Sequence, residues 1–264
     1  MRFSIPVMIL PGLVSVTFRK LAPADIVALV RQAGLAGIEW GGDVHVPHGD
    51  LARAREVREL TEQAGLRVAA YGSYYRAGQS ESDGLPFTRV LDTALELGAP
   101  TIRVWPGGKA SAEVSDQERA RIVADLERIA GLAAARGVTV STEFHAGSLT
   151  DTNESARQLL AEVNHPALLT CWQPHNGEEA APALRGLKAV LPRVGNLHVF
   201  HWWPTSADRR PLAEGAERWQ AYLAELAKSP APGGRERFAL LEFVAGDTPE
   251  AFLRDAETLK QWLA

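Results

Sequence analysis

Hydrophobic residues follow two patterns that alternate along the chain. Short apolar or β-branched runs, such as TIRVW at 101–105, are typical of buried strands, and apolar positions three or four residues apart are typical of amphipathic helices. Strands are predicted at 3–9, 36–40, 67–72, 101–105, 138–144, 168–173, 195–201 and 238–243. Helices are predicted at 23–33, 50–64, 85–97, 115–136, 152–162, 178–190, 215–227 and 248–263.

The junction from helix to strand recurs along the chain. A helix pattern ends near a glycine and a strand pattern follows at Gly34, Gly65, Gly98, Gly137 and Gly195. Glycine takes the left-handed conformation that ends a helix at no steric cost. Eight strand and helix pairs in 264 residues predict an α/β chain folded as a single (β/α)8 TIM barrel, domain 1–264, with a local insertion at 229–237. A doubly wound open sheet is the alternative.

Composition and charge narrow the classes of partner. A net charge of -4 and a pI near 6.0 provide no general attraction for nucleic acid or anionic lipid, so neither partner is expected. Cys171 is the only cysteine, which suits a reducing cytoplasm, and no apolar run reaches the roughly 18 residues that span a bilayer. We expect a soluble cytoplasmic protein. The motifs GxxxxGK[ST], GxSxG and HExxH are absent, as is a strand-linked GxGxxG.

Polar residues gather where strands end, which is where a TIM barrel builds its active site. Six of the seven histidines lie at or just beyond predicted strand ends: His45, His48, His145, His175, His198 and His201. Three carboxylates lie at the ends of strands that are otherwise apolar: Glu39, Glu143 and Glu242. An acid is costly to bury unless it is paired or bound to metal. The strand ends therefore predict a functional site.

Strand alternation selects four of these polar ends. Only every second residue points into a barrel, and this places Glu143, Gln173, His198 and Glu242 inward at the ends of the fifth to eighth strands. Two carboxylates, an imidazole and an amide oxygen suit a divalent ion such as Mn²⁺, Mg²⁺, Co²⁺ or Zn²⁺. The alternative is that each is an ordinary satisfied polar group of the core.

The strand ends STEFH, WQPHN, NLHVFH and LEF resemble those of the xylose isomerase-like barrel superfamily, in particular its tagatose 3-epimerase-like and hydroxypyruvate isomerase-like members. The resemblance implies that Glu143 and Glu242 bind metal and exchange protons and that His198 is a further ligand. Gln173 stands where relatives often carry an Asp; an alternative register aligns Trp172 with that acid, but Pro174 and strand parity favour Gln173. A neutral amide should hold the ion less tightly and leave it more electrophilic.

The resemblance implies a metal-dependent sugar or keto-acid isomerase or epimerase that works through an enediolate, with Glu143 and Glu242 as acid and base. One alternative is a dehydratase of the inosose or 3-dehydroshikimate type on the same scaffold, and another is a non-catalytic carbohydrate-binding relative. An endonuclease of the superfamily would need more His and Asp ligands and a more basic face. The expected partner is a small sugar or polyol-type substrate, and relatives imply a homo-oligomer.

Other residues are predicted to contact substrate. Arg209 matches an arginine that contacts substrate oxygens in relatives, and the remaining predictions are His175, His201, Trp172, Trp105, Tyr74 and His48. Aromatic rings at strand ends suit the C–H faces of a sugar. For each ring the alternative is core filling or subunit contact, and for each polar side chain it is a position on the rim or in a loop.

Overall fold

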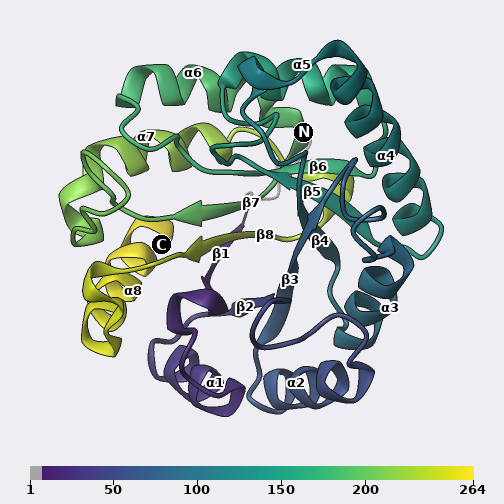
Figure 1. Cartoon of the computed structure of the whole chain (residues 1–264). Coiled ribbons are helices and arrows are strands. Elements are labelled where there is room, and N and C mark those ends of the chain that lie inside the picture. The colour runs from purple at the N-terminus through teal and green to yellow at the C-terminus, as the bar shows by residue number, and fades with distance from the viewer. Residues whose placement is uncertain (1–7) are drawn as a thin grey trace, which may run out of the picture.

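The computed structural model describes residues 8–264. Eight parallel strands close into a barrel in the order of the sequence, so the barrel prediction is confirmed and the open sheet is excluded (Figure 1). The strands are β1 (Ile9–Val14), β2 (Gly37–Gly41), β3 (Arg67–Arg76), β4 (Thr101–Trp105), β5 (Thr139–Glu143), β6 (Leu168–Trp172), β7 (Val194–Val199) and β8 (Arg237–Leu241). β1 pairs with both β2 and β8, which completes the ring.

A helix follows each strand and lies outside it (Figure 1). The helices are α1 (Pro23–Gln32), α2 (Leu51–Gln63), α3 (Phe87–Leu97), α4 (Asp116–Ala134), α5 (Asn153–Val163), α6 (Ala180–Val190), α7 (Ala216–Leu226) and α8 (Pro249–Leu263). Within residues 8–264, none of the helices has the length and apolar character needed to cross a bilayer.

The first strand differs from its prediction. Most of the predicted range 3–9 lies outside the described residues, and β1 runs from Ile9 to Val14 across Pro11, although proline lacks a backbone donor and reads locally as a break in a strand. Pro11 fits because its carbonyl still accepts a hydrogen bond from Ala36 N at 2.8 Å. Gly12 is required beside it, since a Cβ there would lie 2.6 Å from the carbonyl oxygen of Gly37.

Four of the five predicted glycine junctions cap helices. Gly98 follows α3 with φ of 76°, and Gly34, Gly65 and Gly137 take the same left-handed conformation after α1, α2 and α4. Gly195 lies inside β7 instead, so the fifth junction is wrong. The short 3₁₀ turn Leu191–Arg193 connects α6 to β7 without a left-handed residue.

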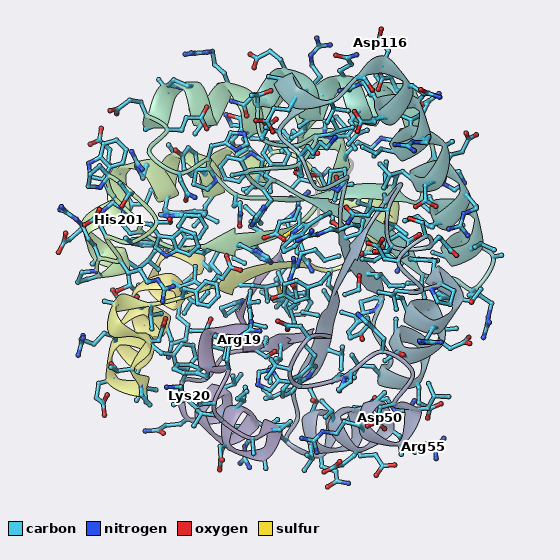
Figure 2. The ribbon with its side chains drawn as sticks, in the orientation of Figure 1. Arg19, Lys20, Asp50, Arg55, Asp116 and His201 are labelled. Atoms are coloured by element: carbon cyan, nitrogen blue, oxygen red, sulfur yellow. The ribbon has the colours of Figure 1, made fainter. Side chains whose placement is uncertain are left out.

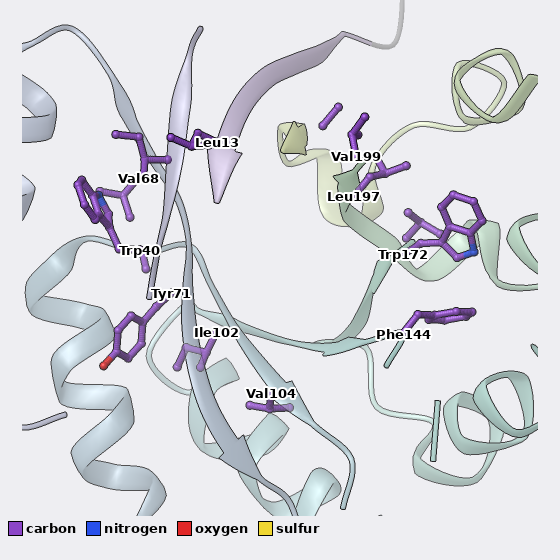
Figure 3. Packing of buried hydrophobic residues seen from close by; sticks show 14 of the residues in the cluster. Leu13, Trp40, Val68, Tyr71, Ile102, Val104, Phe144, Trp172, Leu197 and Val199 are labelled. Carbon is purple, nitrogen blue, oxygen red and sulfur yellow. The ribbon is translucent and has the colours of Figure 1, made fainter. Parts of the chain in front are cut away.

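The core has two layers. The larger hydrophobic cluster fills the space between the strands and the helices, and Figure 3 shows part of it. A smaller cluster of Val14, Val16, Ala69, Phe238 and Leu240 fills the barrel interior. Tyr74 of β3 and Phe243, which follows β8, pack against this cluster.

The insertion before β8 is tied to the barrel by a buried arginine. Arg237, fully buried, donates hydrogen bonds to the carbonyl oxygens of Val194, Gly195, Leu226 and Ser229. Burial lowers its pKa to about 10, which leaves it charged at neutral pH. These contacts join the end of α7, the start of β7 and the segment 229–237.

Asp255 in α8 yields a prediction about stability. It is 5% exposed, accepts a hydrogen bond from Leu212 N at 2.9 Å, and burial raises its pKa from 3.8 to about 6. A raised pKa in the folded state stabilises the fold below pH 4, and this contribution is lost as the pH rises through 6. Asp255→Asn, which keeps the acceptor, should therefore be more stable than wild type by about 1–3 kcal/mol at pH 7 and equal to it near pH 4. Urea unfolding at both pH values measures this; a difference that does not change with pH contradicts it.

Candidate active site

A cavity of about 520 Å³ opens at the carboxyl ends of the strands. Glu143 at the end of β5, Gln173 after β6 and Glu242 after β8 line it, and all three are less than a tenth exposed. His198 of β7 is fully buried among them. The four residues selected by strand alternation are thus brought together at one point.

The Nδ1 atom of His198 is the centre of this group. It faces three oxygens, namely Gln173 Oε1 at 3.1 Å, Glu242 Oε2 at 3.4 Å and Glu143 Oε1 at 3.5 Å. Ligand atoms of Glu143, His198 and Glu242 all lie within 4.8 Å of one another. One nitrogen and three oxygens that converge in a buried site are a donor set that fits a divalent cation.

The amide of Gln173 has a fixed orientation. Its Nε2 donates to the carbonyl oxygen of Phe144 at 2.7 Å, which turns Oε1 toward His198. A carboxylate in the same place would set an oxygen against the Phe144 oxygen. The side chain at this position therefore presents an acceptor to the centre, as the sequence required of a ligand.

Two charged neighbours of this centre, Arg103 and Glu39, were not among the four residues predicted to bind metal. Arg103 of β4 donates through Nε to Glu39 Oε1 at 2.6 Å and through Nη1 to Glu143 Oε2. The second oxygen of Glu39 lies 3.3 Å from His198 Nε2. Arg103 is an inward cation in the apolar run TIRVW and Glu39 ends the second strand, so the sequence held the signal for both.

Charge balance inside the barrel agrees with a divalent ion. Three carboxylates and one guanidinium, from Glu39, Glu143, Glu242 and Arg103, carry a net charge of two negative units when all are ionised, and all are nearly fully buried. A charge of that size is costly in a protein interior without a compensating cation. The donor set and the charge thus fit the same ion.

The ionisation of these groups follows from their neighbours. Burial would raise the pKa of Glu143 and of Glu39, but Arg103 and His198 hold both pKa values below the usual range. Burial would lower the pKa of Arg103, but Glu143 and Glu39 raise it well above its ordinary value. Without an ion, Cys171 and the acids Glu242 and Glu39 outweigh burial and raise the pKa of His198, whose positive charge then offsets part of the negative charge of the interior. The chain thus keeps both acids ionised.

The cavity walls are aromatic and cationic. The rings of Trp105 and His145 stack with centroids 4.7 Å apart, and Tyr74 meets Trp105 edge to face. Trp105 Nε1 also donates to Glu143 Oε2 at 2.5 Å. Arg19, Arg103 and His175 add cationic or polar groups. Tyr74 and Phe243, both in the lining, have positive φ of 57° and 45°, a strain that is found at functional sites.

Of the seven residues predicted to contact substrate, three line the cavity: Tyr74, Trp105 and His175. Trp172 does not, because strand alternation turns it outward against Trp219 and Tyr222 of α7 (Figure 3). His48 also lies outside the lining, since its Nδ1 is hydrogen bonded to the Tyr71 hydroxyl at 2.7 Å. Neither Trp172 nor His48 is therefore placed to contact a substrate in this cavity.

Two further residues predicted to contact substrate, His201 and Arg209, also lie outside the cavity lining. His201 lies beside α7 at the edge of the molecule and lines a different hollow with Trp203 and Arg218 (Figure 2). Arg209 pairs with Asp247 and lies over the ring of Phe243 at 4.6 Å, and it is not among the residues that line the cavity. Arg209 therefore supports a wall of the site instead of lining it.

Comparison with known proteins gives one result for the family and one for the fold. A family model described as xylose isomerase-like TIM barrel matches residues 27–259. A curated relative, the 3-dehydroshikimate dehydratase of Bacillus anthracis, is 30% identical over 278 residues, which cover 94% of this chain and 95% of that protein.

Solved structures of similar fold include a crystal structure of the probable 3-DHS dehydratase from Bacillus anthracis, with a TM-score of 0.79 and 20% identity over 96% of this chain and 99% of the other. The D-allulose 3-epimerase of Methylomonas sp. has a TM-score of 0.72 and 17% identity over 98% and 100% of the two chains. A protein of Mycobacterium smegmatis solved in complex with magnesium has a TM-score of 0.70 and 16% identity over 96% of each. At these identities the structures establish the shared fold alone.

Proposed function

The chain belongs to the xylose isomerase-like TIM barrel family, and we propose that it is a divalent-metal-dependent dehydratase of a cyclic hydroxy-ketone acid of the 3-dehydroshikimate type. The observation that carries the proposal is the match at 30% identity to a dehydratase along nearly the full length of both chains. The epimerase is a more distant relative, at 17% identity. The dehydratase, which was an alternative in the sequence analysis, thus becomes the leading function, and the isomerase or epimerase becomes the second candidate.

The residues that would hold the ion are Glu143, Gln173, His198 and Glu242, because their donor atoms converge on one point. When bound, the ion supplies Lewis-acid stabilisation of the negative charge that develops on the substrate's carbonyl oxygen. The remaining steps fall to side chains of the chain itself.

Glu242 is the better placed of the two acids to remove a proton. Oε2 of Glu143 already accepts hydrogen bonds from Arg103 and Trp105, whereas within residues 8–264 the Glu242 side chain accepts no hydrogen bond and its one ion-pair partner is His198, at 3.4 Å. The Glu242 carboxylate takes the proton from the carbon next to the ketone. The electron pair forms the carbon–carbon double bond, and the bond to the neighbouring hydroxyl breaks. Glu242, now protonated, returns that proton to the leaving hydroxyl, which departs as water, so the step needs no other acid.

The cavity suits a flat anionic ring. Trp105, Tyr74 and His145 form an aromatic wall on which a planar ring can stack. Arg19 also lines this space, and its side chain is 47% exposed beside Asp43, so it is the cation placed to receive a substrate carboxylate; Arg103 is held by Glu39 and Glu143.

Isomerisation or epimerisation is the second candidate, because Glu143 and Glu242 approach the same point from β5 and β8. Two such carboxylates on either side of a substrate could exchange protons without loss of water. The fold shared with the allulose epimerase is compatible with this reaction.

Incubation with Mn²⁺ and a panel of 3-dehydroshikimate, inosose and ketose sugars in D₂O, followed by NMR, tests the proposal. We expect water loss and an aromatic or unsaturated product from the acid, and no turnover in the presence of a chelator. Deuterium exchange into a ketose without water loss would support the isomerase instead. Mn²⁺ binding without turnover of any compound would support a non-catalytic binding protein.

A further inference from the structure

We propose that Glu39 is a positioning residue that fixes both His198 and Arg103, and so prepares the centre for its ion. The inference deepens the proposed function and rests on its metal site. Glu39 ends β2, which lies across the barrel from β6, and is 1% exposed. Neither the resemblance nor the sequence pattern gave it a role beyond its place at a strand end.

The two oxygens of Glu39 serve two different donors. Oε1 accepts from Arg103 Nε at 2.6 Å, and Oε2 lies 3.3 Å from His198 Nε2. Each partner has an exposed fraction of 3% or less. A carboxylate is costly to bury, and here both of its oxygens face cationic or donor groups. Both oxygens of this buried carboxylate are therefore satisfied by groups inside the barrel.

The contact with His198 decides which ring nitrogen faces the centre. A hydrogen bond from Nε2 to Glu39 keeps the proton on Nε2 and leaves the lone pair of Nδ1 directed at Gln173, Glu143 and Glu242. A carboxylate behind a ligating histidine raises the basicity of the ligand and fixes its orientation. Cys171 also lies beside this ring, but a thiol is a much weaker acceptor.

The contact of Glu39 with Arg103 orients a second donor group, the carboxylate of Glu143. With Nε held by Glu39, the same guanidinium reaches Oε2 of Glu143 through Nη1. That leaves Oε1 of Glu143 to face His198. One carboxylate thus orients two of the four donor groups.

The neighbouring strand leaves room for this pair. A Cβ at Gly72 of β3 would lie 2.7 Å from Arg103 Nη2 and 2.9 Å from Glu39 Oε1. Alanine at this position would therefore displace the pair without removing a charge. Gly72→Ala is a second way to disturb the contact and is independent of the chemistry of Glu39.

Calorimetric titration of the metal-free chain with Mn²⁺ alone tests the role. In Glu39→Gln the amide offers one acceptor and sets an NH₂ against a donor, so we expect Mn²⁺ to bind about 10–100-fold more weakly. Gly72→Ala should weaken binding in the same direction. Ser141→Ala is the matched control, because Ser141 is a buried polar residue of β5 whose hydroxyl makes no hydrogen bond with any of residues 8–264. It should bind Mn²⁺ within twofold of wild type.

A spectroscopic readout separates positioning from general destabilisation. In the Zn²⁺-loaded wild type, NMR should show a His198 Nε2–H proton shifted downfield by its carboxylate partner, and this signal should move upfield in Glu39→Gln. Unchanged Mn²⁺ affinity in Glu39→Gln, or equal weakening in Ser141→Ala, overturns the inference. If Glu39→Gln does not fold, Gly72→Ala alone decides. If the wild type binds Mn²⁺ tightly but converts none of the compounds of the NMR panel, the dehydratase is rejected and the Mn²⁺ titrations still decide the role of Glu39. If the wild type does not bind Mn²⁺, both the proposed function and the role of Glu39 are overturned.

Discussion

Glu242→Gln should lower kcat by about 10²–10⁴ while the protein still binds Mn²⁺, because a neutral amide keeps an oxygen for the ion but cannot accept the substrate's proton. Glu143→Gln should lower both kcat and Mn²⁺ affinity, since its amide would set an NH₂ toward donors, Arg103 and Trp105. Steady-state kinetics on the dehydratase substrate and Mn²⁺ titration measure the two effects.

Glu162→Gln is the control for this pair. Glu162 of α5 accepts a hydrogen bond from Arg119 Nε at 2.9 Å and is not part of the cavity lining. Its replacement should leave kcat within about threefold of wild type, a difference that corresponds to less than 1 kcal/mol. Full activity in both Glu143→Gln and Glu242→Gln would reject the proposed acid–base scheme.

Arg103→Met should destabilise the metal-free fold by about 3–5 kcal/mol, because it leaves two buried carboxylates, Glu39 and Glu143, without their cation. Arg103→Lys keeps the charge but not the fork that joins both acids, so it should lie between Met and wild type. Urea unfolding in the presence of a chelator gives these differences.

Arg128→Met provides the comparison at the surface. Arg128 of α4 pairs with Glu81 and Asp125, but its side chain is 42% exposed, so its loss should change the free energy of unfolding by about 1 kcal/mol or less. A cost for Arg103→Met that is as small as this would show that the buried pair does not organise the site.

The barrel could be predicted from the sequence because its signals are local and repeated. Each helix ends near its predicted residue, and four glycines stop helices by adopting a conformation that depends little on distant contacts. The first strand was misplaced because Pro11 reads locally as a break. Whether a strand tolerates proline depends on its neighbours in the sheet, here Ala36 of the adjoining turn, and that information is not local.

The centre of the site was also foreseeable. Alternation along each strand is strict, so Glu143, Gln173, His198 and Glu242 had to share the inner face, and the order of parallel strands brought them together. The same rule applied to Trp172 turns it outward, which is where the structure places it. His201 and Arg209 follow β7 in loop segments, where no periodicity fixes the direction of a side chain.

Arg103 was missed, and Glu39 was noted only as a polar strand end, for a different reason. Each lies on a strand that does not provide a metal ligand, and its importance comes from contacts inside the barrel. Glu39 is 64 residues from Arg103 in the sequence and 159 residues from His198. Such pairing is a property of the closed ring. It becomes visible only when the charges of the whole interior are considered together.

The central claim is that the four strand ends, with a neutral amide in place of an acid, hold a divalent ion. The most direct measurement is an anomalous difference map from crystals soaked in Mn²⁺. We predict one strong peak at roughly 2.0–2.6 Å from His198 Nδ1, Gln173 Oε1 and an oxygen each of Glu143 and Glu242. No peak at this centre, or a peak bound by the acids and His198 with Gln173 Oε1 turned away, would contradict the account.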